Sequence, residues 1–302
     1  MKQKRILRLI SASILIILLF SVFSSCKVKP KEYEYIYFGE YPQTLKADDV
    51  VITSVTDTRG YYLGSDGSYY AKVVATPYET YGQKACTFSN GAMVNNGKEY
   101  YFKVEPIRWR ILCENDGKAF IMCDSIIANM AFSSYEVNSK DDEIIANDYE
   151  TSDIRFWLNN NFYNIAFVSD QQEKILTTTV DNSLASYSGS NSDYVYNDTE
   201  DKIFLLSYAD AQNKEYGFDE QSICVERQLK PSDYAKATGA DMFNEGEKYS
   251  GNGCGYWLLR SPAESKDRKD VYLVHAQSRF SFANARHSQY GIVPAMWIIY
   301  ES

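Results

Sequence analysis

Two acidic clusters are the first candidates for chemistry, because paired carboxylates can serve as general acid and general base. The first is Asp141-Asp142-Glu143, and the second comprises Asp198 and Glu200-Asp201. Such catalysis requires one carboxyl buried so that its pKa rises. Both clusters occur in polar stretches, which predicts solvated carboxylates. The second cluster gathers hard oxygen donors of the kind that calcium prefers, although its spacing matches no recognised calcium loop.

Cysteines and histidines are too scattered for a metal centre. Five cysteines follow residue 26, and their odd number leaves at least one thiol without an intrachain partner. The chain has no Cys-x-x-Cys motif, and its two histidines, His275 and His287, exclude a three-histidine site. We therefore expect no cofactor. We predict a disulfide between Cys224 and Cys254, both in the C-terminal half. Cys254 could instead be a nucleophile, but no histidine is near it in sequence.

Arginine and aromatic residues gather in two late segments that could bind a ligand. The first lies at the end of an apolar run, where a polar loop is expected, and the second spans residues 277–288. Loops carried on a rigid sheet are common binding sites, and a guanidinium donates paired hydrogen bonds to a carboxylate, sulfate or sugar hydroxyl. The predicted ligand-binding residues are Trp257, Arg260, Ser261, Arg279, Asn284, Arg286 and His287.

Each of these segments also has a purely structural interpretation. Trp257 could belong to the core, and Arg260 could bridge loop carbonyls. The segment 277–288 could be no more than an exposed hairpin. His275 alternates with the apolar residues Leu273 and Val274 and is expected to be structural.

The N-terminus has the pattern of a secretory signal. Four basic residues lie within the first eight positions, and an almost wholly apolar run from Leu9 to Phe23 follows. This run is shorter than the roughly 20 apolar residues of a membrane-spanning helix. The alternative is an uncleaved anchor with an incidental cysteine at position 26.

The residues Phe23-Ser24-Ser25-Cys26 resemble the lipobox of bacterial lipoproteins, with Phe in place of the usual Leu. The resemblance implies removal of residues 1–25 and lipidation of Cys26, which anchors the protein to the cell-envelope membrane on its extracytoplasmic side. Removal takes away four basic and no acidic residues, so the net charge changes from −9 to −13. Such an acidic protein is not expected to bind nucleic acid or to dock on anionic lipid through basic residues. The acidity could equally be that of a well-solvated surface.

The order of predicted elements is β, then helix, then β. A strand at 33–38 is expected to end at Gly39 and Pro42. Hairpins are predicted around residues 64–67 and around Asp116-Gly117, since Asp-Gly between alternating apolar runs favours a tight turn. The arms of the second hairpin carry Cys113 and Cys123, out of register and too far apart for a disulfide.

The middle and late parts of the chain complete this order. Helices are predicted from Ser152, from Ser169 through Leu176 with Gln172 completing a capping box, from Ser207 with Asp210, and between Ser232 and Gly239. A loop is expected at 186–201, and strands at 203–206, 256–259, 271–274 and 292–299. This order predicts an α+β fold rather than alternating βαβ units.

Six stretches taken together resemble DUF6273, a bacterial domain family, over residues 35–300. They are YFGEYPQ (37–43), PIRWRIL (106–112), IRFWLN (154–159), FLLS (204–207), WLLRSP (257–262) and GIVPAMWI (291–298). The family in turn resembles the C-type-lectin-like fold, which also houses the formylglycine-generating sulfatase-modifying enzymes. The resemblance implies mostly antiparallel mixed sheets with a few short helices. The chain departs from related sequences at Val293, where Arg is usual.

These observations give a domain plan and a function. Residues 1–25 are the predicted signal peptide, 26–34 a tether, and 35–302 the DUF6273-like domain. We expect a noncatalytic domain of C-type-lectin-like fold that binds a glycan, a peptide or another envelope protein. The alternatives are an enzyme related to the sulfatase-modifying group and a purely structural surface protein.

Overall fold

The computed structural model describes residues 32–79, 85–134, 145–187, 189–219, 223–265 and 267–301. All of them belong to one contact unit, Glu32–Ser302. The predicted signal peptide, Cys26 and the acidic cluster at 141–143 lie outside the described residues. Among the helices of the described part, none is long and apolar enough to cross a membrane.

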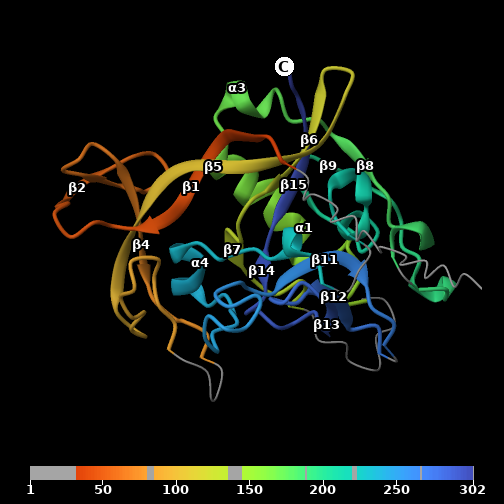
Figure 1. The fold of residues 1–302 in the computed structure, drawn as a ribbon. Helices are drawn as coiled ribbons and strands as arrows, with labels where there is room; N and C mark the ends of the chain where they lie inside the picture. Colours follow the sequence, from red (N-terminus) through yellow and green to blue (C-terminus); the bar gives the residue numbers. More distant parts are fainter. Residues whose placement is uncertain are drawn as a thin grey trace, which may run out of the picture. The chain divides into compact units, whose positions relative to one another are not determined.

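The largest sheet has eight strands. They are β1 (Tyr35–Leu45), β2 (Ile52–Thr56), β3 (Tyr62–Gly64), β4 (Tyr69–Val74), β5 (Glu99–Asn115), β6 (Lys118–Cys123), β10 (Phe204–Leu205) and β15 (Pro294–Ile299). Their order is β10-β15-β6-β5-β4-β3-β2, and β1 pairs with β5, beside which it runs in Figure 1. The β5–β6 hairpin turns at Asp116 and Gly117 with φ of 47° and 72°. Two positive φ values are typical of a type I′ turn, so the predicted hairpin is confirmed.

Strand β1 is longer than predicted. Gly39 and Pro42 do not end it, because its pairing with β5 shifts register between Tyr37 and Glu40 and again between Pro42 and Thr44. Such bulges let a strand accommodate residues that the regular ladder would exclude. Gly39 has a φ of 67°, and a Cβ there would lie 2.5 Å from the ring of Phe167. Close packing therefore explains this glycine, which the sequence pattern had suggested was a strand end.

Two smaller sheets complete the β structure. The five-stranded sheet has the order β13 (Phe280–Asn284), β12 (Asp270–Val274), β11 (Trp257–Pro262), β14 (Gly291–Ile292) and β7 (Ala128–Asn129). The third sheet pairs β8 (Thr178–Val180) with β9 (Thr199–Asp201). The named strands of the described residues pair antiparallel except β11 with β14. The predicted α+β class with mostly antiparallel sheets is confirmed.

The helices are short. They are α1 (Asp153–Trp157), the π-helix η1 (Leu158–Phe162), α2 (Tyr163–Ala166), α3 (Ser169–Gln172) and α4 (Asp233–Thr238), with 3-10 turns η2 (Leu184–Ser186), η3 (Ser192–Tyr194), η4 (Asp210–Gln212), η5 (Lys214–Tyr216) and η6 (Val225–Arg227). Ser232 caps α4 and Gly239, with a φ of 111°, ends it, as predicted.

Two helix predictions are wrong. Ser169 is the first residue of α3 rather than its cap, and α3 ends at Gln172, short of Leu176. Ser207 and Asp210 do exchange hydrogen bonds between side chain and backbone, at 2.8 and 3.0 Å. The two 3-10 turns η4 and η5 follow them in place of an α-helix, and the carboxylate of Asp210 also accepts a hydrogen bond from Arg260.

One large hydrophobic cluster joins both main sheets to the helices. Trp109 and Trp257 are fully buried in it, and each indole donates a hydrogen bond to a carbonyl, of Phe38 at 2.7 Å and of Arg227 at 3.1 Å respectively. Burial of so much aromatic surface is the main stabilising contribution. From the helical segment, Phe162 packs edge-on against Tyr41 of β1 at 5.3 Å. This contact fixes the helix that carries the candidate site.

None of the five cysteines of the described residues forms a disulfide, so the predicted Cys224–Cys254 disulfide is wrong. The two residues have different surroundings. Cys224 belongs to the main core and its sulfur contacts Glu226 at 3.1 Å, whereas Cys254 lies in a separate small cluster. Burial raises the pKa of the Cys254 thiol, which does not favour a nucleophilic role. Cys113 and Cys123 pair with other residues of the hairpin and do not bridge, as predicted.

Candidate functional site

The helical segment 153–166 contains a π-helical turn that sets the geometry of the candidate site. Ser152 begins the segment by accepting a hydrogen bond from the backbone of Arg155 at 3.3 Å, as predicted. Trp157 and Phe162, five residues apart, stack at 5.3 Å with an interplanar angle of 24°. This spacing fits the i to i+5 repeat of the π-helix, which is uncommon and often occurs at functional sites.

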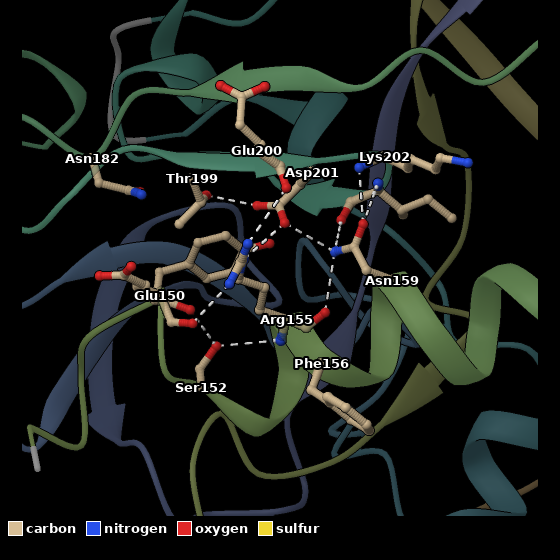
Figure 2. Close-up of polar contacts among 12 residues, drawn as sticks. Glu150, Ser152, Arg155, Phe156, Asn159, Asn182, Thr199, Glu200, Asp201 and Lys202 are labelled. Atoms are coloured by element: carbon tan, nitrogen blue, oxygen red, sulfur yellow. Dashed lines mark hydrogen bonds and ion pairs between the residues drawn. The ribbon is translucent and has the colours of Figure 1, made fainter.

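Asn159, within the π-turn, binds the chain at residues 201–203 through both ends of its amide. Its Nδ2 donates to the carbonyl of Ile203 at 2.9 Å and to Asp201 Oδ1 at 3.3 Å. Its Oδ1 accepts from the backbone amides of Lys202 at 2.9 Å and Ile203 at 3.1 Å. Figure 2 shows this side chain reaching across to the segment after β9. The side-chain amide thus links the helix to the strand region because it donates to and accepts from main-chain groups, as the backbone of a neighbouring strand would.

Asp201 is the buried anion of the site. Its side chain is 1% exposed, and Arg155, 28% exposed, contacts its Oδ1 through Nε at 2.7 Å. Thr199 donates to the other carboxylate oxygen at 2.6 Å. Burial raises the pKa of Asp201, while the hydrogen bond from Thr199 and the charge of Arg155 lower it, and burial prevails. The prediction of a solvated carboxylate is therefore wrong here, because alternation along β9 turns this residue inward.

The guanidinium of Arg155 connects three parts of the chain. Besides Asp201, it donates through Nη1 to the carbonyl of Glu150 at 2.9 Å and through Nη2 to that of Glu200 at 3.4 Å. The turn before α1, the helix itself and strand β9 are thereby held together (Figure 2). Charge-assisted bonds of this kind make a rigid frame.

A groove of about 450 Å³ opens over this frame. Phe156 is 65% exposed, and its ring extends away from the ion pair in Figure 2. Glu200 points away from Asp201 and accepts a hydrogen bond from Thr179 at 2.5 Å. The groove is lined by Glu150, Thr151, Ser152, Arg155, Phe156, Asn159, Asn160, Thr177, Glu200, Asp201 and Lys202. Amides, hydroxyls and both signs of charge beside an exposed ring suit noncovalent recognition of a small polar molecule.

The second acidic cluster does not converge on one point. Asp198 accepts from the backbone of Asn182 at 2.9 Å, Glu200 from Thr179, and Asp201 from Arg155. Across the described residues, no group of three or more His, Cys, Asp or Glu side chains could hold a metal ion. The calcium alternative is therefore not supported for this cluster.

Three of the residues predicted to bind ligand lie inside the protein. Trp257, Arg260 and Ser261 are buried in β11, so the prediction of a loop after Leu259 is wrong. The strand continues to Pro262 because Arg260 finds internal partners. Its Nη1 donates to the carbonyl of Leu205 at 2.8 Å and to Asp210 at 2.7 Å. The structural interpretation of Arg260 is the one that the geometry favours.

The other four predicted residues lie on or beside β13, two strands away from β11. Arg279, Arg286 and His287 are exposed and Asn284 is half-buried. The seven residues therefore do not form one surface.

His275 accepts a hydrogen bond from the backbone of Gln277 at its Nδ1, at 3.0 Å. Burial, with a smaller contribution from Arg279, lowers the pKa of His275, in keeping with its predicted structural role.

Sequence reasoning missed the groove. Arg155, Phe156 and Asn159 belong to the helix predicted from Ser152 and to the family-like stretch 154–159, but none of them was predicted to bind a ligand. Two signals could have drawn attention to them: a run of three asparagines at 159–161 within a helical pattern, and aromatic residues five positions apart. Asparagine is a poor helix former that prefers local hydrogen bonds, so its repetition in a helix needs a tertiary reason.

One family model, described as Domain of unknown function (DUF6273), matches residues 116–299. No curated protein and no solved structure matches the chain. The matched range begins inside the turn of the β5–β6 hairpin, and strands β1 to β5 precede it. The two motifs quoted at 37–43 and 106–112 therefore lie outside the match, although β5 pairs directly with β6.

Proposed function

Since the chain belongs to the DUF6273 family, we propose that it is a cell-envelope lipoprotein whose domain binds a ligand without converting it. The binding site is the groove between the helical segment 153–166 and strand β9. The observation that carries this proposal is the exposed ring of Phe156 beside a rigid polar frame. An exposed aromatic ring beside fixed polar groups offers a ligand an apolar face together with hydrogen-bonding partners, the combination typical of small-molecule sites.

The ligand that this groove fits best is a short glycan. A sugar ring has an apolar CH face, which can pack on Phe156, and a rim of hydroxyls that both donate and accept hydrogen bonds. Asn160 offers an amide, Glu200 a carboxylate and Lys202 an ammonium group along the groove. The volume of about 450 Å³ is within the range of small-molecule sites.

The same frame favours binding over catalysis. The carboxylate oxygens of Asp201 accept from Arg155, Asn159 and Thr199. A carboxyl committed to three protein donors is a fixed element of the site rather than a group that exchanges protons with a substrate.

Membrane attachment through a lipid on Cys26 is the second part of the proposal. It is supported by the basic N-terminus, the apolar run and the sequence Ser24-Ser25-Cys26. Fatty-acid labelling of cells that express wild type or Cys26→Ala tests it. Label that depends on Cys26 supports the anchor, and equal label in both would contradict it.

We also propose that the domain is a distant relative of the C-type-lectin-like fold. Mostly antiparallel sheets, short helices between an early and a late β region, and a final buried strand support this. An experimental structure compared with that fold in strand order would test it.

Glycan binding is tested with the processed lipoprotein in detergent micelles and a panel of soluble oligosaccharides, by calorimetry. Phe156→Ala should weaken the binding of a responding glycan roughly three- to tenfold, as expected for loss of one aromatic contact. Val195→Ala, another exposed apolar side chain, is the matched control and should bind as wild type. The proposal is wrong if no oligosaccharide binds, or if Phe156→Ala binds as well as wild type.

A further inference from the structure

Strand β13 forms an open edge of the five-stranded sheet. Its one strand neighbour within the described residues is β12, and five residue pairs are in register from Val274 with Phe280 to Asp270 with Asn284. Figure 1 shows β11, β12 and β13 in succession. An edge strand presents main-chain donors and acceptors that can pair with another extended chain.

The hydrogen-bond pattern shows which groups face outward. The carbonyl of Arg279 accepts from His275 and the amide of Ala285 donates to Lys269, both at 2.7 Å. Antiparallel residues alternate between bonded and non-bonded pairs, so the odd-numbered residues of β13 bond inward to β12. The main-chain groups of Phe280 and Phe282 therefore point toward the open side.

Side chains along this edge are aromatic and basic. Phe282 is 64% exposed at the middle of the strand and stands opposite Tyr272. Phe280 packs on Tyr208, with ring centroids 4.3 Å apart, and this contact holds the edge strand against the domain. Arg279 lies just before the strand and donates to the neutral side chain of Gln277 at 2.7 Å.

The basic residues flank the aromatic centre. Arg279 precedes β13, and Arg286 and His287 follow it, all exposed. Positive charge at both ends of one edge contrasts with a whole chain of net charge −9. The extended chain from Arg279 to Asn284 spans about 17 Å, and Arg286 lies in the turn that follows, in which the amide of His287 donates to the carbonyl of Asn284 at 3.0 Å.

We propose that β13 binds an extended acidic peptide of a partner protein as an added strand. The peptide backbone pairs with Phe280 and Phe282, an apolar peptide side chain packs on Phe282, and acidic residues near the two peptide ends meet Arg279 and Arg286. Strand addition of this kind takes its affinity from the backbone and its specificity from alternate side chains. The site is separate from the glycan groove and does not depend on it.

A second copy of this chain is a poorer occupant of the same edge. Antiparallel pairing of two β13 strands about Phe282 would bring Arg279 of one copy toward the turn of the other copy that carries Arg286 and His287. Like charges brought together across strands are destabilising. The same arginines would accept a peptide of opposite charge.

The test uses a fluorescent nine-residue peptide with alternating Thr and Val at its centre and Glu at both ends, added to the full lipoprotein in micelles. Anisotropy should report saturable binding, and a matched peptide with Lys at both ends should bind at least tenfold more weakly. Arg279→Gln and Arg286→Gln should each weaken binding roughly tenfold, as for loss of a charged hydrogen bond. N-methylation of the central peptide amides should abolish binding, since it removes the backbone donors.

Matched controls separate this site from the glycan groove. Phe282→Ala should weaken the peptide and leave glycan binding unchanged, whereas Phe156→Ala should do the opposite. Equal binding of the N-methylated peptide, or unchanged binding by both arginine variants with unaltered melting temperatures, would overturn the proposal. If the protein binds no peptide but forms concentration-dependent dimers that Arg279→Gln strengthens, the proposal is wrong and the arginines only protect the edge from self-association.

Discussion

Replacing Arg155 by Met should destabilise the protein strongly, because the buried carboxylate of Asp201 would then lose its ion-pair partner. The carboxylate is 1% exposed, and the Arg155 contact at 2.7 Å supplies the neighbouring positive charge. Removing one partner of a buried ion pair costs about 3–5 kcal/mol. Since Arg155 itself is 28% exposed, solvent screens part of the interaction, and the lower end of the range, about 3 kcal/mol, is expected. For a domain of this size the melting temperature should fall by roughly 6–12 °C.

The pH dependence of this loss identifies its cause. Burial already raises the pKa of Asp201 in the folded protein, and loss of the Arg155 charge raises it further. A carboxyl whose folded pKa lies above its unfolded value stabilises the folded state below the unfolded pKa, and this contribution is lost as pH rises through the folded pKa. The destabilisation of Arg155→Met relative to wild type should therefore shrink as pH falls from 7 toward 5.

Urea unfolding followed by tryptophan fluorescence at pH 7 and pH 5 measures both quantities. The double variant Arg155→Met with Asp201→Asn is the control, because a neutral amide needs no counter-ion. It should be more stable than Arg155→Met alone at pH 7, and its difference from Asp201→Asn should vary little with pH. A loss below 1 kcal/mol, or a loss equal at both pH values, would refute the assignment of Asp201 as a buried charge held by Arg155.

Asn159→Ala removes the four hydrogen bonds to residues 201–203 and should cost about 2–3 kcal/mol in urea unfolding; a cost near zero would mean that the amide does not join helix and strand. The pKa of His275 is lowered by burial, so its stabilising contribution is present above pH 6.5 and is lost as pH falls through the folded pKa. His275→Asn should therefore lose less melting temperature than wild type between pH 7 and pH 5. Unaltered acid sensitivity of that variant would exclude this histidine as the source. When it is denatured without reductant, the mature chain should react with five equivalents of a thiol reagent. Reaction with only three equivalents would indicate a disulfide, such as the predicted Cys224–Cys254 pair.

The parts of the fold that could be predicted from sequence are those set by neighbouring residues. The Asp116-Gly117 turn and the Ser232 to Gly239 helix depend on local φ preferences and capping, and both are confirmed. The continuation of β1 through Gly39 depends on pairing with β5, more than sixty residues later in the chain. No local signal indicates that pairing, so the strand end was predicted too early.

The candidate site could not be predicted from the sequence for the same physical reason, because its contacts join residues that are far apart in the chain. Asp201 lies in a polar stretch, and its partner Arg155 is 46 positions away. The partner of Arg260, Asp210, is 50 positions away, so a residue expected on a loop became part of the interior. A charged residue is usually predicted to be exposed. This prediction fails for a long-range ion pair, because a buried charge is tolerated when it is paired. Arg279 and Arg286, predicted to lie in a ligand-binding segment or in an exposed hairpin, are exposed just before and just after the edge strand β13.

The groove and the β13 edge both lie within residues 116–299, the range shared with the family, yet the groove depends on residues outside it. Phe162 is the last residue of the π-helix η1 that also contains Asn159, and its ring packs on Tyr41 of β1. Phe167, at the end of the same helical segment, fills the space beside Gly39, where any Cβ would collide with its ring. A family member without strands β1 to β5 would expose these two rings, and burial of a phenylalanine contributes roughly 1.5–3 kcal/mol. The β1–β5 region is therefore part of the same folding unit, and the groove requires it for its shape.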